Sequence, residues 1–189
     1  MIEKIMKAVK SSNKKRSRNI TIGAVIGFLL SCTAVMGADS YLWIKEDSGE
    51  IKFSTTGDNG NWNEKNPYEN AGNIWDTVIK TYTNNITLSS NGANGVNENN
   101  SISYGLRLSG NLTDVNFVNN GSITGEASNS SYGYGIYNSA EIGNIENKGI
   151  INGTGDIKGY GIYNSDSAKI GDIINSETIS GAGSGNYGY

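Results

Sequence analysis

Four carboxylates in the last third of the chain are the side chains best suited to do chemistry: Asp156, Asp166, Asp172 and Glu177. Two carboxylates that flank a glycosidic bond serve as acid and base, or as acid and nucleophile, in sugar hydrolysis. No spacing among these four selects one pair over another. The sequence is therefore compatible with a polysaccharide-acting enzyme, but it predicts no catalytic residues.

Other reactive arrangements are missing from the sequence. It contains no histidine, which excludes Ser-His-Asp and Cys-His sites and His-ligated metals. No phosphate-binding GxxxxGK[ST] segment occurs, and GAGSG at 181–185 lacks the spacing of a nucleophile elbow. The segment DNGNWNE, residues 58–64, lacks the alternating acids and closing Glu of a calcium loop. We expect a chain that is not an enzyme and that has no catalytic, cofactor-binding or metal-binding residues.

A recurring phrase supplies a second set of side chains able to make contacts. Its three copies are YGLRLSG (104–110), YGIYNSA (134–140) and YGIYNSD (160–166). An aliphatic column, predicted to point inward, contains Leu106, Ile136 and Ile162. The next column contains Arg107, Tyr137 and Tyr163, and because it accepts Arg we expect it to face outward. This column is a candidate binding row; the alternative, which we favour, is that the rings only cover the sheet and stack on one another.

A second phrase follows each copy of the first: FVNNGSITG from Phe117, IENKGIING from Ile145 and IINSETISG from Ile173, separated by 28 and 28 residues. Its alternation with period two is the signal of a strand. The predicted inward columns are Phe117, Ile145, Ile173 and, six residues later, Ile123, Ile151 and Ile179. Between them lie Asn119, Asn147 and Asn175. We predict that these asparagines mark a corner between two short strands and form a ladder of stacked amides.

Together the two phrases make a repeat of roughly 26–30 residues. Such a unit is too poor in aliphatic residues to bury a core alone, whereas stacking on its neighbours buries one. We therefore predict an all-β fold, a parallel β-solenoid (β-helix). Disorder is the alternative for a chain so rich in Gly, Ser and Asn, but disorder does not require aliphatic columns. Because NYGY at 186–189 matches SYGY at 131–134, we expect the chain to be truncated within a repeat.

The N-terminal residues have the composition of an export signal. Residues 1–38 hold seven Lys or Arg and one acid, with KKRSR at 14–18 followed by an uncharged run that ends before Asp39. This pattern predicts a signal peptide over 1–38, cleaved after Ala38. The alternatives are a retained membrane anchor and a lipoprotein modified at Cys32, the single cysteine of the chain.

The segment 39–95 lacks the repeat and contains all three tryptophans, Trp43, Trp62 and Trp75. We expect it to be an N-terminal cap that covers one end of the repeats at 96–189, with the tryptophans packed inside it. SYLWI and EIKFS predict two strands joined by a turn at EDSG. NIWDTVIKTYTNNITLS, 73–89, fits either a helical face or strands, and we favour a strand from Asn85 onward.

Charge limits the classes of partner. Residues 39–189 hold eight bases and seventeen acids, so phosphate backbones are repelled and we expect no nucleic-acid partner.

A basic N-terminal extension with a signal core, a Trp-containing lead-in and cysteine-free repeats such as YGIYNS and NKGIING resemble the start of a Gram-negative autotransporter of the type V secretion family. That resemblance implies a β-helical passenger at the cell surface or secreted, and passage through the export machinery. It also implies outer-membrane attachment through a C-terminal β-barrel that this sequence does not contain. The implied function is that of a virulence-associated adhesin or structural stalk that binds a host or bacterial surface protein or glycan. A polysaccharide-acting β-helix enzyme and a surface lipoprotein with repeats are the alternatives.

Overall fold

The computed structural model describes residues 40–56, 61–90, 102–127 and 131–184. The chain divides into two units, Met1–Gly37 and Ala38–Tyr189, and every described residue belongs to the second. The predicted signal peptide and its cleavage site at Ala38 lie outside the described residues. Within the described residues the fold is all-β with mostly parallel sheets. It has one short 3₁₀ helix, η1 (Glu69–Ala71), and no α-helix.

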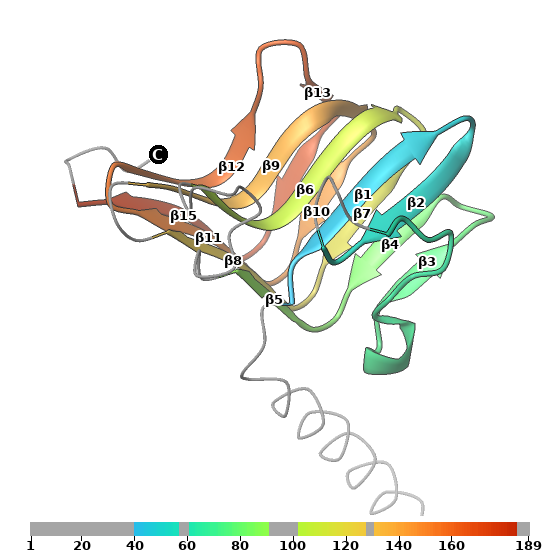
Figure 1. Cartoon of the computed structure of the whole chain (residues 1–189), viewed down its shortest axis with the longest axis horizontal. Coiled ribbons are helices and arrows are strands. Elements are labelled where there is room, and N and C mark those ends of the chain that lie inside the picture. Colours follow the sequence, from blue (N-terminus) through green and yellow to red (C-terminus); the bar gives the residue numbers. More distant parts are fainter. Residues whose placement is uncertain (1–39, 57–60, 91–101, 128–130, 185–189) are drawn as a thin grey trace, which may run out of the picture. The chain divides into compact units, whose positions relative to one another are not determined.

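The strands assemble into three sheets (Figure 1). Sheet A has the order β12-β9-β6-β1-β2, with β13 beside β9; sheet B has the order β14-β10-β7-β4-β3; sheet C has the order β15-β11-β8-β5. Sheet A contains β1 (Leu42–Asp47), β2 (Glu50–Ser54), β6 (Ile102–Leu112), β9 (Tyr132–Ile142), β12 (Lys158–Asn164) and β13 (Lys169–Ile170). Sheet B contains β3 (Ile74–Asp76), β4 (Thr81–Asn84), β7 (Asn116–Asn119), β10 (Ile145–Asn147) and β14 (Ile173–Asn175). Sheet C contains β5 (Thr87–Ser90), β8 (Ser122–Ala127), β11 (Ile150–Gly155) and β15 (Thr178–Gly183).

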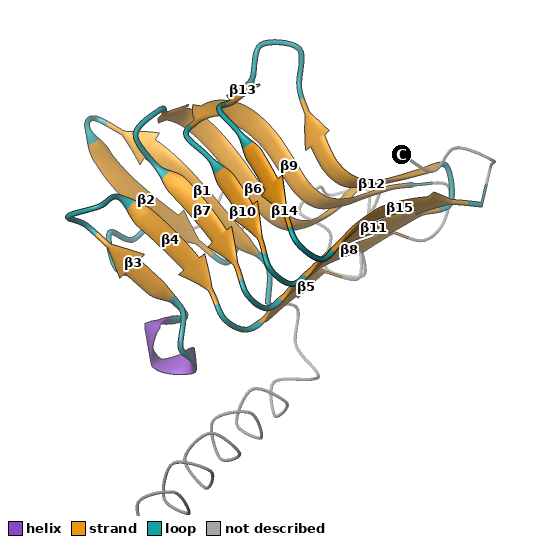
Figure 2. Ribbon diagram, turned by 180° about the vertical axis from the view of Figure 1, so that it is seen from behind, coloured by secondary structure: helices purple, strands orange, loops and turns teal. Residues whose placement is uncertain are grey.

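The chain visits the three sheets in the same order four times. We call each visit a layer: β1, β4 and β5 form layer 1; β6, β7 and β8 layer 2; β9, β10 and β11 layer 3; and β12 with β13, β14 and β15 layer 4. Neighbouring layers pair through parallel strands in all three sheets. Figure 2 shows the strands of sheet B side by side from the opposite direction.

Strand register aligns the residues that the two sequence phrases place in columns. Tyr134 pairs with Tyr104 on one side and with Tyr160 on the other. Ile145 likewise pairs with Phe117 and Ile173. The separation of 28 residues between copies of the second phrase thus equals the chain length from β7 to β10 and from β10 to β14. The segment before residue 96, which lacks the repeat in sequence, supplies the first parallel strand of each sheet.

The core lies between the three sheets. One cluster of buried side chains draws members from all of them, including Leu42, Leu106 and Ile136 from sheet A, Phe117 and Ile145 from sheet B, and Ile123 and Ile151 from sheet C. These predicted inward residues of layers 2 and 3 are at most 1% exposed. Each small layer therefore gains its apolar burial from the layers above and below it.

A glycine in the first phrase lets sheets A and C approach closely. A Cβ on Gly135 would lie 2.6 Å from Gly161 O and 2.8 Å from Ile151 Cγ2. Gly105 and Gly161 face Ile123 and Ile179 in the same way in the neighbouring layers. Only a residue without a side chain fits this position, which explains why Gly follows Tyr in every copy of the phrase.

The segment 39–95, expected to be an N-terminal cap, adds two antiparallel strands, β2 and β3, to layer 1. Strands β1 and β2 form a hairpin. Its two turn residues, Ser48 and Gly49, have φ of 59° and 87°, and a two-residue hairpin turn of type I′ requires a positive φ at both residues. Strand β3 pairs antiparallel with β4. Strands β2 and β3 therefore lie on the outer edges of sheets A and B. A further parallel layer would otherwise pair at these edges.

The helical alternative for residues 73–89 is wrong, and the strand expected from Asn85 onward is β5, which begins at Thr87. The chain forms β3, a turn, β4 and β5 instead. Asp76 Oδ1 accepts hydrogen bonds from the backbone N–H groups of Val78 and Ile79, at 2.9 and 3.1 Å, which fixes a turn inside the supposed helical face. Val78 is 89% exposed as a result.

Layer 4 departs from the predicted core. Ile173 is 49% exposed and Ile162 and Ile179 are only half-buried, whereas the paired Ile145 is 0% exposed. Ile173 continues the column of Phe117 and Ile145 but is exposed in the outermost described strand of sheet B. The physical reason is that β14 pairs with β10 on one side, and no described strand covers its other side.

Candidate functional site

An aromatic face covers the side of sheet A that is turned away from the core. Leu42 and Ile44 pack into the core, so Trp43 between them points to the opposite side of the strand. We define this aromatic face as Trp43, Trp62, Tyr104, Tyr134, Tyr137, Tyr160 and Tyr163, with Arg107 among them. It includes two members of the candidate binding row, Tyr137 and Tyr163, on the side opposite to Ile136 and Ile162.

The tyrosines form two parallel rows across the layers. Tyr104, Tyr134 and Tyr160 stack face to face at centroid separations of 5.5 and 5.3 Å. Tyr137 and Tyr163 stack at 5.4 Å in the second row. Rings of different rows meet edge to face, as Tyr134 and Tyr137 do at 5.3 Å and 83°. Such contacts stabilise a sheet surface by about 0.5–1.5 kcal/mol per pair beyond area burial.

Arg107 is held by the rings around it. It pairs in register with Tyr137, and its guanidinium carbon lies 4.3 Å from the Trp43 ring centroid and 5.5 and 5.6 Å from those of Tyr104 and Tyr137. A guanidinium over aromatic faces is attracted by their negative centres. Arg107 therefore covers Trp43, so the outward column is half-buried at this residue instead of fully solvent-exposed.

Burial affects the ionisation of one tyrosine of the aromatic face, Tyr134. Desolvation, followed by the nearby Tyr104 and Tyr160, raises the pKa of Tyr134 far above its ordinary value. A neutral phenol is both a donor and an acceptor of hydrogen bonds. The aromatic face thus combines an apolar surface with phenol hydroxyls and the charged guanidinium of Arg107.

Stacking also limits which parts of the rings are accessible to a ligand. Tyr137 and Tyr163 stack on each other, which occupies one face of each ring, and both remain half-buried. They can offer a ligand their edges, their hydroxyls and the remaining ring face. Sequence reasoning selected Tyr137 and Tyr163 but did not assign a face to Tyr104, Tyr134 and Tyr160. The signal was present, because these tyrosines open each copy of the first phrase.

The asparagine column forms a continuous side-chain ladder at the corner between sheets B and C. The Nδ2 of Asn84 donates to Asn119 Oδ1, that of Asn119 to Asn147 and that of Asn147 to Asn175, each at 2.8 Å. Each of these four Nδ2 groups also donates to a backbone carbonyl two residues further along the chain. Asn84, which begins the ladder, comes from the segment in which sequence reasoning found no repeat.

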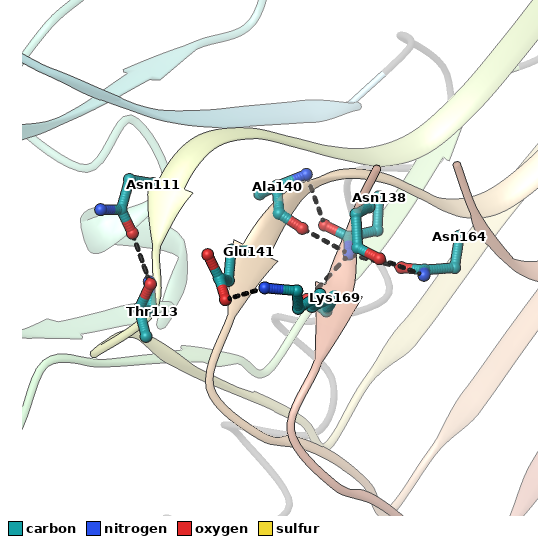
Figure 3. A network of polar contacts seen from close by, with 8 residues as sticks. Asn111, Thr113, Asn138, Ala140, Glu141, Asn164 and Lys169 are labelled. Atoms are coloured by element: carbon teal, nitrogen blue, oxygen red, sulfur yellow. Dashed lines mark hydrogen bonds and ion pairs between the residues drawn. The ribbon is translucent and has the colours of Figure 1, made fainter. Parts of the chain in front are cut away.

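Figure 3 shows a second amide contact, at the end of the first phrase, that sequence reasoning missed. Asn138 Nδ2 donates to Asn164 Oδ1 at 2.7 Å and to Ala140 O at 3.1 Å, while Asn138 Oδ1 accepts from the Ala140 N–H. Beside it, Lys169 and Glu141 form an ion pair at 2.8 Å. The recurring YNS of the phrase was the available signal, but layer 2 has Leu108 at this register position.

A cleft of about 770 Å³ lies where the cap meets the turn that follows β6. It is lined by Glu46, Gly49, Glu50, Ile51, Glu64, Trp75, Thr77, Lys80, Asn111, Leu112, Thr113, Asp114 and Val115. Lys80 and Asp114 form an exposed ion pair at 3.1 Å. The four carboxylates singled out in the sequence, Asp156, Asp166, Asp172 and Glu177, do not line the cleft and are all exposed.

Two further classes of feature are absent from the described ranges. No group of three or more His, Cys, Asp or Glu side chains is arranged to hold a metal ion there. None of the helices in that part of the chain is long and apolar enough to cross a membrane.

Comparison with known proteins adds no name to the geometry described above. No protein-family model matches the chain, and searches of curated proteins and of solved structures return no match. The candidate site is therefore argued from its residues alone.

Proposed function

We propose that the repeats form a parallel β-solenoid that acts as an adhesive or structural stalk of an exported protein, and that the aromatic face is its contact surface. The observation that carries the proposal is the alignment of two tyrosine rows along successive layers of sheet A. A repeating surface suits binding to a repeating or extended partner. A catalytic site, by contrast, needs one singular arrangement.

The chemistry of the face indicates the kind of partner. Tyr adds rigid apolar area at low entropic cost, and its hydroxyl makes hydrogen bonds. Because stacking occupies one face of Tyr137 and of Tyr163, a partner can approach their edges, their hydroxyls and the remaining ring face. A surface protein or a glycan of a host or neighbouring cell has complementary groups. Export and surface display rest on the charge pattern of residues 1–38, and attachment to an outer membrane rests on the autotransporter resemblance.

Binding of the purified chain to cells and to immobilised glycans tests the contact surface. Tyr137→Ser with Tyr163→Ser should abolish binding while the melting temperature falls by only a few degrees. Tyr137→Phe with Tyr163→Phe keeps both rings and should weaken binding less. The matched control is Val118→Ser with Glu146→Ser, at paired positions of sheet B in layers 2 and 3. Unchanged binding by the Tyr→Ser pair would reject the aromatic face as the contact surface.

Export is tested separately. N-terminal sequencing of surface material should begin near Asp39. A start at lipid-modified Cys32 would favour the lipoprotein, and recovery of the intact chain in the inner membrane would favour the retained anchor.

A polysaccharide-acting enzyme is the second candidate. The cleft favours this function, because a catalytic site needs one singular arrangement and the lining of the cleft does not recur from layer to layer in the described residues. That lining includes Glu46, Glu50, Glu64 and Trp75. Release of new sugar ends from polysaccharides, abolished by Glu46→Gln or Glu64→Gln, would support this function. No release by the unmodified chain would exclude it for the polysaccharides tested.

A further inference from the structure

Four described asparagines begin an Asn-x-Ser/Thr triplet, the acceptor signature for N-linked sugars. They are Asn85, Asn111, Asn120 and Asn152. The triplets at Asn19, Asn99 and Asn129 lie outside the described residues. Because Asn, Ser and Thr are abundant in this chain, the triplet alone selects no site. The nitrogen that would accept the sugar is Nδ2, so its hydrogen bonding must decide.

In three of the four triplets the acceptor nitrogen is already engaged. Asn85 Nδ2 donates to Gly72 O at 2.7 Å. Asn120 Nδ2 donates to the oxygen of Asn85 at 2.8 Å. Asn152 Nδ2 donates to the hydroxyl of its own triplet, Thr154, at 3.3 Å. In Asn85 and Asn152 the side chain is also only half-exposed.

Asn111 has the opposite arrangement. It lies near the end of β6, directly after Gly110, whose φ is 83°, and it pairs in register with Glu141 of β9. The Oδ1 of Asn111 accepts hydrogen bonds from both the backbone N–H and the hydroxyl of Thr113. Figure 3 shows the amide nitrogen on the side away from Thr113. Both residues are exposed, and no hydrogen bond joins Asn111 Nδ2 to another described residue.

This geometry suits glycosyl transfer. A carboxamide nitrogen is a poor nucleophile, and it must lose a proton when it forms a bond to carbon. Negative charge then develops on Oδ1, and the Thr113 hydroxyl already donates to that oxygen. The cleft of about 770 Å³ that Asn111 and Thr113 help to line is open space beside the acceptor.

We propose that Asn111 is the N-glycosylation site of the folded chain, and that the donor is a sugar activated by a phosphate ester at C1. The Nδ2–C1 bond forms while the C1–O bond to phosphate breaks. The bonding electron pair leaves with the phosphate oxygen, and one Nδ2 proton passes to a base of the transferase. The donor is either nucleotide-linked or lipid-linked. This site does not depend on the adhesive function.

The test treats the folded chain of residues 1–189 in two arms. One uses a soluble asparagine glycosyltransferase with a nucleotide-diphosphate hexose, and the other a membrane oligosaccharyltransferase with a lipid-diphosphate oligosaccharide. Peptide mass spectrometry then measures occupancy at all four triplets, and an unstructured acceptor peptide verifies each enzyme. We expect Asn111 to be modified at least fivefold more than Asn85, Asn120 or Asn152 in one arm, which identifies the donor class.

Variants separate the proposed geometry from simple exposure. Thr113→Ser should retain modification and Thr113→Val should lose it, with equal melting temperatures. In chain unfolded by urea before a brief reaction, the preference for Asn111 should fall to within twofold of the other triplets. An unmodified Asn111 in both arms, or equal occupancy of all four triplets in the folded chain, would overturn the proposal.

Discussion

The side-chain amide of Asn119 donates to Asn147 Oδ1 at 2.8 Å, although 28 residues separate the two in sequence. Both side chains are fully buried. Because each amide in this ladder donates to the next layer and to a backbone carbonyl, the ladder ties the corner of every layer to its neighbour. Its removal at one point should therefore weaken the stack.

Asn147→Asp keeps the shape of the side chain but replaces its donor with a carboxylate. The variant loses the hydrogen bonds to Asn175 Oδ1 and Gly149 O and buries a charge. We expect a loss of about 3 kcal/mol in the free energy of unfolding, measured by urea denaturation. Asn175→Asp, in the exposed last rung, is the matched control and should cost less than about 1 kcal/mol. Equal losses for the two variants would contradict the ladder's role.

The two faces of sheet A should respond differently to truncation. Ile136 is 0% exposed, so Ile136→Ala should lower the free energy of unfolding by about 2–5 kcal/mol. Tyr137→Ser removes a half-buried ring that contacts Tyr104 and Tyr134, and we expect less than half that loss. Thermal unfolding measures both variants. If Tyr137→Ser were as damaging as Ile136→Ala, the assignment of core and outer face would be reversed.

Gly135→Ala tests the close approach of sheets A and C. The added Cβ would lie 2.8 Å from Ile151 Cγ2 and 3.0 Å from Asn152 O of sheet C, and 2.6 Å from Gly161 O of the neighbouring strand in sheet A, so the backbone must move to relieve the overlap. We expect a loss of about 2–4 kcal/mol, as for other strained or overpacked substitutions. In Gly49→Ala, the control, the added Cβ meets nothing within 4 Å, although φ is 87°. That variant should lose only about 1 kcal/mol, and a similar or greater loss than for Gly135→Ala would argue against sheet contact as the cause.

Alkaline pH should destabilise the fold through its buried tyrosines. Burial raises the pKa of Tyr82 and Tyr134 far above the ordinary value of 10.0. A raised pKa favours the folded state fully below the unfolded value, so this contribution is lost as pH rises above 10.0. Ultraviolet absorbance should show later tyrosine ionisation in the folded chain than in urea. Tyr82→Phe should reduce the loss of stability above pH 10.0, and an unchanged pH dependence would mean that Tyr82 does not contribute.

The periodic parts of the fold could be predicted without coordinates. Phe117, Ile145 and Ile173 recur at equal spacing with alternating polarity, and in-register parallel strands need that spacing to place like residues side by side. The asparagine column could be found for the same reason, because an amide ladder requires an Asn at each rung. These patterns are local, so the sequence by itself determined the strands, the columns and the corner.

The tertiary structure alone decided which residues outside the phrases join the stack. Trp43 shares no motif with later layers, whereas YTNN at 82–85 resembles FVNN at 117–120. Strand pairing places Trp43, Tyr82 and Asn84 beside Arg107, Phe117 and Asn119. It also decided that Arg107 lies over Trp43. Ile145 is buried and Ile173 is exposed, because burial depends on a neighbouring strand that covers the residue. The position of an isoleucine in the repeat does not show whether such a strand is present. Long-range packing and register, unlike periodicity, are properties of the assembled sheets.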